Sequence, residues 1–554
     1  MKFFPLVASS AILVIPQAAL SAPPDAGVLQ QQFQRDSIEL PQVEPKNLPE
    51  PATALPAVGE TMVVTAFEFV GNTVFKTEEL LTLIANYQAK PVTFNDLLNA
   101  VAKVGEFYRN AGWVARVYVP EQEVKNGVVR LQVVEGRYGK WNLDGGAPSS
   151  FNTDRVDGYL TNAQASGELL NSDRMDRALL LLDDLSGINV VGNLTTGENT
   201  SQTDLLLQVG DEAQTEGQLS LDNFGSRSTG VARLNGEVYF KSPTNIGDQV
   251  RANLTHSEGN DFVSLAYTRP VGYDGWRVGV NGSYLKYDVI LDEFAAADLD
   301  GKSSTLGLEA NYPIIRQRNQ NLYLGISYDA KKYENRSQKS VTSDYSVDSA
   351  TFSLNGNLFD RIGGGGANSM ALAVTSGNVD FGSIDTSEDV AIEGKYTKLT
   401  YALSRQQVIT NDLSLFANVG GQFADGNLDS SEQYYLGGPS GVRAYPVSEA
   451  GGDEGVVANL ELRYRLQSDL VLTGFYDWGE ILQNKDNVTA QDDPNRYQLK
   501  GAGVSLAWTA PYGIKVNATL ARRAGKNPNP TSDGNDQDGS LDMNRFWLNV
   551  AVPF

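Results

Sequence analysis

The last eleven residues of the sequence, Asn544 to Phe554, read NRFWLNVAVPF. Apolar residues occupy every second position from Phe546 to Phe554, which gives the segment one continuous apolar face as a β-strand. Strands of about ten residues that alternate in this way are the units of transmembrane β-barrels. The segment therefore predicts a membrane-spanning strand at the C-terminal side of the chain.

The same alternation recurs upstream. In residues 457–466, VANLELRYRL, apolar residues alternate with Asn, Glu and Arg, and from about residue 212 onward no convincing helix interrupts such strands. A soluble sandwich shows this alternation too, but the connections here are of two kinds: short turns such as 271–277 and long polar loops such as 522–544. That division is typical of bacterial outer-membrane barrels. We predict a mainly β fold in which residues 212–554 form a transmembrane antiparallel barrel of about 16 strands.

The composition excludes several classes of functional site. The chain has no cysteine and one histidine, His256, so disulfide scaffolds, cysteine-rich metal sites and thiol nucleophiles are excluded and a Ser-His-Asp triad nearly so. A net charge of -23 argues against nucleic acid as a partner. The Asp-rich stretch 532–540 misses the spacing of a calcium loop, and we expect it to be a solvated extracellular loop. We therefore expect no enzymatic activity, no metal and no cofactor.

The N-terminal segment predicts export from the cytoplasm. Residues 1–22 contain a lysine, an apolar core and small residues before Ala22, as in a cleavable signal peptide. Beyond them no run of about twenty apolar residues exists, so a transmembrane helix is not expected. Residues 23–40 include a short polar segment that is either a helix or a tether, and residues 41–60 form a Pro-rich linker.

A small α/β unit is predicted over residues 61–137. Thr77 is expected to cap one helix, and Thr93 with Asp96 resembles a capping box at the start of a second helix that Gly112 ends. Strands follow at 113–119 (WVARVYV) and 127–136, giving the order strand, two helices, two strands. A second unit of similar size is predicted over residues 138–211, from the strand 139–146, the helix 172–187 and the closing strand 203–210.

One segment of the barrel region does not fit a strand or a tight turn. Residues 436–446, LGGPSGVRAYP, combine glycines and prolines with a single arginine, Arg443. A guanidinium that leaves water needs an anion. Residues 472–479 offer one, because as a strand they place Asp477 on the face opposite Leu472 and Tyr476, and those apolar residues suit lipid. Asp477 is therefore expected to point into the lumen.

With this order of segments the whole chain resembles two-partner secretion transporters, the TpsB branch of the outer-membrane assembly and export superfamily. FEFVGNTVF (67–75) and VPEQEVKNGVVRLQVVEG (119–136) resemble the family's first POTRA domain, and LSLDNFGSRSTG (219–230) resembles its entry into the barrel. The resemblance implies POTRA domains at 61–137 and 138–211 in the periplasm, a barrel in the outer membrane, and a plug helix in the pore formed by 23–40.

The resemblance also implies functional residues. The loop 436–452 is expected to fold into the pore, and its motif, usually VRGY or VRGF, corresponds to Val442, Arg443, Ala444 and Tyr445. The matching F-x-D-x-G motif of the barrel wall corresponds to Phe475, Asp477 and Gly479. Alanine replaces the usual glycine at 444, so the backbone there should avoid a positive φ. The terminal Phe554 resembles the signal that outer-membrane proteins present to the barrel-assembly machinery.

The function implied is export of an unfolded partner exoprotein, a β-helical adhesin or haemolysin with an N-terminal secretion domain, without nucleotide hydrolysis. The strand 113–119, beside the helix 93–111, is expected to capture the client by β-augmentation. The residues expected to bind the client are Trp113, Val114, Ala115, Arg116, Val117, Tyr118 and Val119. Three alternatives stay open at this point: an outer-membrane insertase of the same superfamily, a passive porin and an envelope enzyme.

Overall fold

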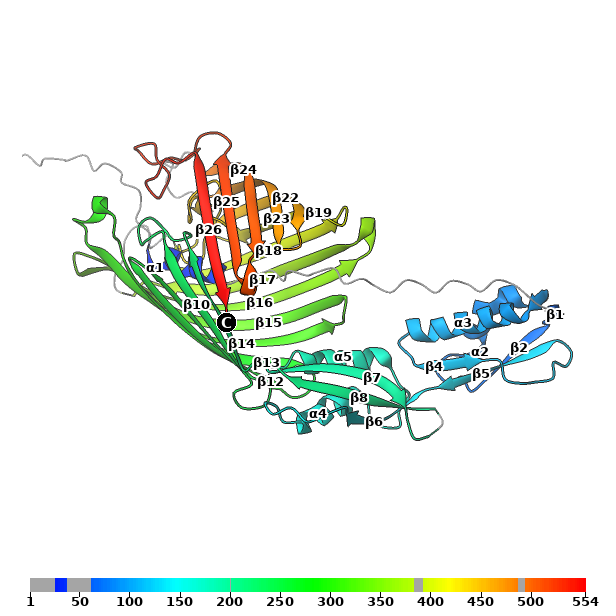
Figure 1. Cartoon of the computed structure of the whole chain (residues 1–554). Coiled ribbons are helices and arrows are strands. Elements are labelled where there is room, and N and C mark those ends of the chain that lie inside the picture. Colours follow the sequence, from blue (N-terminus) through cyan, green and yellow to red (C-terminus); the bar gives the residue numbers. More distant parts are fainter. Residues whose placement is uncertain (1–24, 37–60, 200, 383–391, 487–493) are drawn as a thin grey trace, which may run out of the picture.

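The computed structural model describes residues 25–36, 61–199, 201–382, 392–486 and 494–554. The predicted signal peptide at 1–22 and the Pro-rich linker at 41–60 lie outside these residues. The first described strand after the linker begins at Thr61. Figure 1 shows a large barrel that holds a helix, α1 (Ala26–Asp36), and two small α/β units at one end of it. Within the described parts of the chain no helix is long and apolar enough to cross a membrane.

Sixteen strands of the described residues close into one antiparallel barrel, as the sequence predicted. Consecutive strands pair with one another, and β26 closes the ring by pairing with β9. The strands are β9 (Thr215–Asp222), β10 (Arg233–Lys241), β11 (Gln249–Ser257), β12 (Asn260–Val271), β13 (Trp276–Asp288), β14 (Leu299–Arg316), β15 (Gln320–Ser337), β16 (Ser340–Asp360), β17 (Gly366–Asp380), β18 (Gly394–Val408), β19 (Leu413–Ala424), β22 (Glu454–Gln467), β23 (Leu470–Leu482), β24 (Arg496–Thr509), β25 (Lys515–Arg523) and β26 (Asn544–Pro553).

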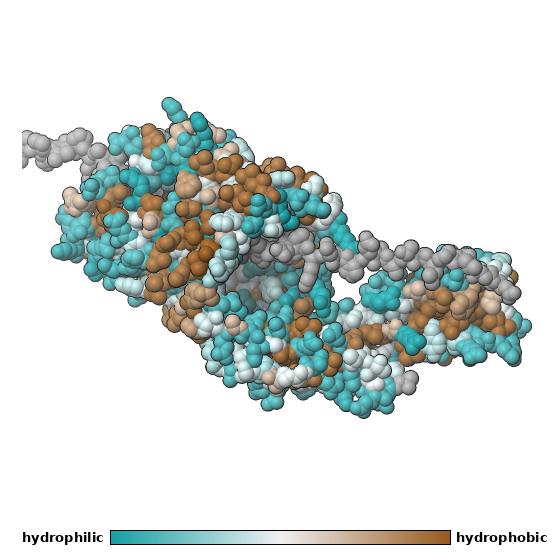
Figure 2. Space-filling view, viewed as in Figure 1, coloured by the Kyte–Doolittle hydropathy of each residue, from teal (hydrophilic) through white to brown (hydrophobic). Residues whose placement is uncertain are grey.

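The alternation of the strands separates an apolar outside from a polar inside. In β22, Leu460 and Leu462 are about half exposed on the outer face, whereas Glu461 between them is buried on the inner face. Figure 2 shows apolar residues gathered over the barrel strands and hydrophilic residues at their borders. This apolar surface is the one that a membrane-spanning barrel presents to lipid.

The connections are short at one end of the barrel and of mixed length at the other. Two-residue connections also occur at the end that carries the long loops, so the predicted separation of short turns from long loops holds only in part. The short end includes 272–275, 317–319 and 468–469; the other end includes 425–453 and 524–543, but also 258–259 and 338–339. Short 3-10 turns η2 (Asp292–Phe294), η3 (Ile362–Gly364) and η4 (Pro511–Gly513) complete the connections.

The terminal residue completes the closure of the barrel. The N–H of Phe554 donates to the carbonyl of Gly217 at 2.9 Å, and the N–H of Gly217 donates back to the Phe554 carbonyl at 3.0 Å. A Cβ at position 217 would lie 2.7 Å from the Phe554 ring, so glycine leaves the space that the ring occupies. Phe554 itself is mostly exposed.

The first α/β unit packs two helices against a three-stranded sheet of order β2-β5-β4. Leu97, Val101, Val104 and Tyr108 form one face of its longer helix and are buried in its core. The elements are β1 (Thr61–Val63), β2 (Ala66–Val70), α2 (Thr77–Ile84), the 3-10 turn η1 (Ala85–Tyr87), β3 (Pro91–Thr93), α3 (Phe94–Asn110), β4 (Ala115–Tyr118) and β5 (Val128–Glu135).

Helix caps in this unit follow the sequence in one case and depart from it in the other. The capping box of Thr93 and Asp96 is present: the Thr93 N–H donates to Asp96 Oδ2 at 2.7 Å, and the Asp96 N–H donates to Thr93 Oγ1 at 3.2 Å. The expectation that Thr77 caps α2 was wrong. Lys76 is the N-cap, because Glu79 accepts from the Lys76 N–H at 2.9 Å and thereby fixes the helix start one residue earlier.

The second α/β unit has the same layout with sheet order β6-β8-β7. Its sequence signals named only three elements, and the structure adds α4 and β7, whose short and mixed patterns gave no periodic signal. The elements are β6 (Arg137–Leu143), α4 (Asp154–Ala163), α5 (Ser172–Asp183), β7 (Ile188–Thr196) and β8 (Gln202–Asp211).

The second unit is held against the short-turn end of the barrel. Arg316 at the end of β14 donates to both carboxylate oxygens of Asp184, at 2.8 and 2.7 Å. The ring of Tyr159 on α4 packs edge-on against Tyr273 in the turn 272–275, with ring centroids 5.5 Å apart. A bidentate ion pair and a ring contact on different turns fix the orientation of this unit relative to the barrel mouth.

A buried carboxylate, Glu135, organises the first unit where β5 ends. Its oxygens accept from the backbone N–H groups of Thr73 and Val74 at 2.7 and 2.9 Å, from the Tyr108 hydroxyl at 2.9 Å, and from the Thr73 hydroxyl. Burial raises the pKa of Glu135, but these hydrogen bonds outweigh burial and hold the pKa below its ordinary value.

Glu135→Gln is therefore expected to weaken the first unit at neutral pH. We expect a loss of about 1–3 kcal/mol, because the substitution leaves buried donors without a charged acceptor. Since the folded pKa is lowered, the carboxylate's contribution is fully present above the unfolded pKa and is lost as pH falls through the folded pKa. Hydrogen exchange of β5 and α3 in the full chain measures this effect, with β8 as the internal control. If the difference in hydrogen-exchange protection between wild type and variant is as large at about pH 3 as at neutral pH, this assignment is contradicted.

Candidate functional site

The longest connection of the barrel folds into its lumen. Residues 425–453 join β19 to β22, and within them β20 (Tyr434–Tyr435) pairs with β21 (Gly451–Gly452). We call residues 425–435 and 451–453 the two legs of this loop and residues 436–450 between them its tip. The tip between the legs lies against the inner face of β22, β23 and β24. Leu436, Val442, Ala444 and Tyr445 of the tip are almost completely buried there.

Arg443 at the tip binds Asp477 on the inner face of β23. The Arg443 Nε donates to Asp477 Oδ2 at 2.9 Å and Nη2 donates to Oδ1 at 2.7 Å, so the two groups form a fork-to-fork pair. The Arg443 backbone N–H also donates to Asp477 Oδ2, at 3.1 Å. Asp477 is completely buried. The structure thus brings together the two charged residues that the sequence paired.

Further residues complete the surroundings of this pair. Arg443 Nη1 donates to Glu461 at 2.8 Å, and Asn459 donates to Asp477 at 2.8 Å and to the carbonyl of Gly441 at 3.1 Å. The guanidinium carbon lies 3.5 Å from the ring centroid of Phe475, a cation–π contact. Two carboxylates, Asp477 and Glu461, are matched here by two guanidinium groups, because Glu461 also accepts from Arg463 at 2.8 Å.

Small residues on the wall make room for the motif. A Cβ at Gly479 would lie 3.2 Å from Val442 Cγ2 and 3.1 Å from Leu436, so the glycine of the wall motif allows the tip to pack closely. A Cβ at Gly501 would lie 2.5 Å from the Ala444 Cβ. The methyl of Ala444 therefore fits because β24 carries a glycine opposite it.

The loop backbone accommodates alanine at 444 without strain. Ala444 is not among the residues with positive φ, whereas Gly438 has φ +104°. Gly437 permits a close backbone approach, since a Cβ there would lie 2.1 Å from the carbonyl oxygen of Pro446. The positive φ values of this loop therefore lie at Gly438 before the arginine and at Ser448 and Ala450 after it, and not at position 444.

The last connection of the barrel supports the loop, contrary to expectation. The Asp-rich stretch 532–540 was expected to be solvated, but Asp536 is completely buried and accepts from Arg523 Nη1 at 2.9 Å and from Arg545 at 3.2 Å. Glu449 of the loop accepts from Asn527 at 2.6 Å and from the Gln537 N–H at 2.8 Å. The expectation was wrong for Asp536, because the two arginines that flank this connection in the sequence face inward and neutralise it, whereas Asp533 is exposed as expected.

The last strand also contacts the tip directly. The indole Nε1 of Trp547 on β26 donates to the carbonyl oxygen of Arg443 at 2.7 Å. Sequence reasoning missed Trp547, Glu461 and Gly501, because their contacts depend on strand register around the barrel. The inward direction of Glu461 and Asn459 was readable from alternation, but their partners were not.

The helix α1 lies inside the barrel and is bound to both the wall and the loop. Asp25 accepts from the Ser430 hydroxyl at 2.8 Å, and Gln30 is bonded to Ser283 at 3.1 Å and to Ser303 at 2.9 Å. Next to Ser430 on the same leg, Glu432 forms ion pairs of 2.7 Å with the wall lysines Lys331 and Lys398. α1 therefore contacts the wall directly and also contacts the loop, which is itself bound to the wall.

The strand expected to bind a client occupies a sheet edge. Of residues 113–119, β4 comprises Ala115–Tyr118 and pairs only with β5, in register Ala115↔Glu135 to Tyr118↔Gln132. Ala115 and Val117 pack on the core, while Arg116 lies 5.5 Å over the exposed ring of Tyr118. Trp113 bridges to Asn171 of the second unit, so the free edge is shorter than the predicted segment.

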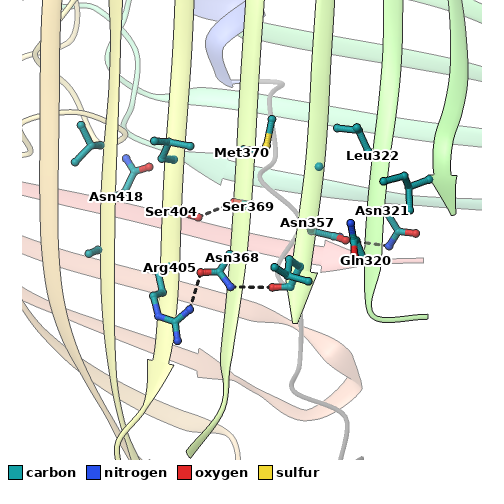
Figure 3. Close-up of a pocket in the computed structure, with 16 residues that line it drawn as sticks. Gln320, Asn321, Leu322, Asn357, Asn368, Ser369, Met370, Ser404, Arg405 and Asn418 are labelled. Atoms are coloured by element: carbon teal, nitrogen blue, oxygen red, sulfur yellow. Dashed lines mark hydrogen bonds between the residues drawn. The ribbon is translucent and has the colours of Figure 1, made fainter. Parts of the chain in front are cut away.

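A hollow of about 770 Å³ on β15–β19 lies on the outer side of the barrel wall, outside the lumen. Lys398 of β18 binds Glu432 in the lumen, so Ser404, an even number of residues away, points inward and Leu403 points outward. Figure 3 shows these strands side by side, with Ser404 bonded to Ser369 and Arg405 bonded to Asn368. The apolar lining from Leu403 and Met370 therefore belongs to the lipid-facing surface.

Among the described residues no group of His, Cys, Asp and Glu is arranged to hold a metal ion.

Comparison with known families places these features in context. The family model described as haemolysin secretion/activation protein ShlB/FhaC/HecB matches residues 201–508. A model of the ShlB-type POTRA domain matches residues 62–136. The heme/hemopexin transporter protein HuxB of Haemophilus influenzae (strain ATCC 51907 / DSM 11121 / KW20 / Rd) is 28% identical over 496 residues, which covers 86% of this chain and 84% of the relative. The outer membrane transporter CdiB of Dickeya dadantii is 21% identical and covers 81% of this chain and 80% of the relative.

Solved structures share the fold. CdiB from Escherichia coli matches with a TM-score of 0.74 at 20% identity, over 97% of this chain and 100% of that one. BamA from Haemophilus ducreyi, lacking POTRA domains 1–3, matches with a TM-score of 0.52 at 16% identity, over 89% of this chain and all of that one. The insertase alternative is not favoured, because the family model that matches most of the barrel describes secretion proteins.

The pairing of Arg443 with Asp477 predicts a strongly non-additive pair of substitutions. Arg443→Ala and Asp477→Ala should each lower the free energy of unfolding by about 3–5 kcal/mol, because each leaves a buried charge without its partner. The double variant should cost less than the sum. Urea unfolding of the purified chain in detergent micelles measures these values.

A matched control is Arg465→Ala, which removes an exposed arginine from β22 and should change stability by no more than about 0.5 kcal/mol. Additive effects of the two single substitutions at 443 and 477 contradict the pairing as a unit.

Proposed function

Because the chain belongs to the ShlB/FhaC/HecB family of haemolysin secretion/activation proteins, and is thus a two-partner secretion transporter of the outer membrane, we propose that it captures an unfolded exoprotein in the periplasm and exports it through its own barrel. The members of this family are transporters. We assign no catalytic step to the chain, and we propose that folding of the client outside the cell supplies the direction of transport in place of nucleotide hydrolysis.

The cellular location orients the structure. The barrel lies in the outer membrane and the POTRA domains lie in the periplasm. The short-turn end, which contacts the second α/β unit, therefore faces the periplasm, and the connections 425–453 and 524–543 are on the cell-surface side. We assign residues 61–137 and 138–211 as the first and second POTRA domains and 212–554 as the barrel.

The observation that carries the proposal is how the lumen is closed. A barrel of about sixteen strands encloses an aqueous channel unless something fills it. Here the filling consists of α1 and the loop 425–453, and neither segment is a strand of the wall. α1 is held by side-chain hydrogen bonds and apolar contacts that can break and re-form. We propose that α1 leaves, and that the loop tip moves, when a client enters.

Client capture is assigned to the edge strand β4. Its outer edge has no partner among the described strands, and α3 lies next to it. An extended segment can add to such an edge through backbone hydrogen bonds, and side chains such as Tyr118 then contact alternate residues of the client. The client class that fits is a chain without tertiary structure. We propose a β-helical adhesin or haemolysin with an N-terminal secretion domain, as the family resemblance suggested.

Assembly of the barrel requires partners as well. We propose that the barrel-assembly machinery recognises the last strand with its exposed terminal Phe554, and that outer-membrane lipid covers the apolar outer face of the strands. Lipid is needed around the barrel wall because half-exposed residues such as Leu460 and Leu462 require an apolar environment.

Crosslinking α1 in place is expected to block export. A Cβ at Gly27 would lie 2.7 Å from Ser430 Oγ, and the chain has no native cysteine, so Gly27→Cys with Ser430→Cys forms a single defined disulfide. In oxidising medium the double variant should release little exoprotein, and a reductant should restore release. The two single variants, which cannot crosslink, serve as controls. Undiminished release from fully crosslinked protein would falsify departure of α1.

A photo-crosslinking residue at position 118 is expected to capture the client in living cells. The same residue at Val70, exposed on β2 at the opposite edge of the sheet, should capture much less. Immunoblotting and mass spectrometry of the crosslinked products measure both. Equal yields at the two positions would exclude β4 as the preferred edge.

A further inference from the structure

The surface beneath α1 departs from the pattern of the rest of the lumen. Along the inner face, strands are joined by pairs of polar side chains, such as Asn253 with Ser264 at 3.1 Å and Thr351 with Thr375 at 2.9 Å. Beneath α1 a cluster of apolar and aromatic side chains interrupts this pattern, with the serine of β14, Ser303, between Leu285 and Tyr333. This surface, here called the lumen patch, consists of Phe262, Leu285, Tyr287, Tyr333 and Tyr345 on β12, β13, β15 and β16.

α1 covers part of the lumen patch with one face, and the loop 425–453 covers Tyr345, whose hydroxyl donates to Asp429 at 3.2 Å. Ala26, Leu29 and Phe33 lie on that face and are buried, and the ring of Phe33 stacks on Phe262 with centroids 4.7 Å apart and planes within 7°. The polar side chains of α1 bind groups that many polypeptides can satisfy. Gln30 bonds to two serine hydroxyls, and Gln32 donates to the backbone carbonyl of Phe224 at 3.0 Å.

A patch of this kind is unfavourable in an open aqueous pore. When α1 departs, the part of the lumen patch that it covers, including the ring of Phe262, meets water unless another apolar surface replaces α1. In a transporter the polypeptide in transit is the surface that enters the lumen at that moment. A client segment with apolar side chains offsets the cost of exposing the patch, so it and α1 compete for the same residues.

The spacing of the patch suits an extended chain as well as a helix. Along a helix axis Leu29 and Phe33 are about 6 Å apart, at 1.5 Å per residue. Alternate residues of an extended strand are separated by about 6.6 Å, at 3.3 Å per residue. Two side chains of an alternating apolar–polar segment can therefore occupy the positions that Leu29 and Phe33 occupy.

We propose that the lumen patch is a binding site for apolar side chains of the translocating polypeptide, and that α1 occupies it as an internal stand-in for that polypeptide. The inference rests on the proposed export function and adds to it the place of contact and the chemistry of the client: extended segments in which aliphatic or aromatic residues alternate with polar ones. The patch thus has two successive occupants, α1 at rest and the client during export.

The test separates a client site from a surface that only holds α1. In a chain from which residues 25–36 are deleted, Phe262→Ala should reduce exoprotein release several-fold, because the client loses a stacking partner. Phe262→Leu, which keeps an apolar side chain, should restore most of the release. Val263→Ala, on the outer face of the same strand, is the matched control and should have no effect. If Phe262→Ala has no effect once α1 is absent, the patch serves only α1 and the inference is overturned.

A second measurement distinguishes this inference from the proposed function itself. A photo-crosslinking residue is placed at position 262, or at Asn355 in the lumen of β16 away from the patch, and a client is stalled in transit by a folded C-terminal fusion. Crosslinks from both positions, stronger at 262, support the inference. Crosslinks from 355 alone overturn it and leave export through the barrel intact. Crosslinks from neither position contradict both, because no client then passes through the lumen.

Discussion

The ion pair between Arg443 and Asp477 is the constraint on which the pore loop depends. A guanidinium and a carboxylate that are removed from water are stable only with close partners, and Asp477 is completely buried. The tip of the loop therefore has one position on the wall at which its charge is matched. The neighbouring residues follow from that position: Phe475 lies under the guanidinium, and Gly479 and Gly501 leave room for the residues on either side of Arg443.

This pair is connected to the other parts that fill the lumen. One leg of the loop carries Ser430, which binds the start of α1, and Glu432, which pairs with two wall lysines. The tip carries Glu449, which is bonded to the last connection of the barrel through Asn527. The tip is in turn bonded to the last strand through Trp547. A client that passes through the barrel must therefore displace α1 and the loop together, and movement of one of them breaks its contacts with the other.

Much of this could be predicted from the sequence, since alternation is a local property. The barrel, its strand number and the inward direction of Asp477 followed from period-two patterns, and the pairing with Arg443 followed from charge balance and the family resemblance. What the sequence did not reveal depends partly on register between distant strands and partly on side-chain contacts within one connection or one helix start. Ala444 fits because Gly501 lies opposite it, and Asp536 is buried because Arg523 and Arg545 face it. Lys76 replaces Thr77 as a helix cap because a side chain three residues later reaches back to it. None of these contacts has a periodic signal.

The most direct measurement of the account is the accessibility of the loop tip at rest and during export. The chain has no cysteine, so Val442→Cys provides a single thiol at a position that is completely buried against Gly479. Labelling of this thiol in intact cells with a membrane-impermeant maleimide reports whether the tip is in place. The account predicts protection at rest and rapid labelling when a client is stalled in the barrel. Equal labelling in both states would contradict the central claim that the Arg443–Asp477 pair holds the tip against the wall until a client arrives.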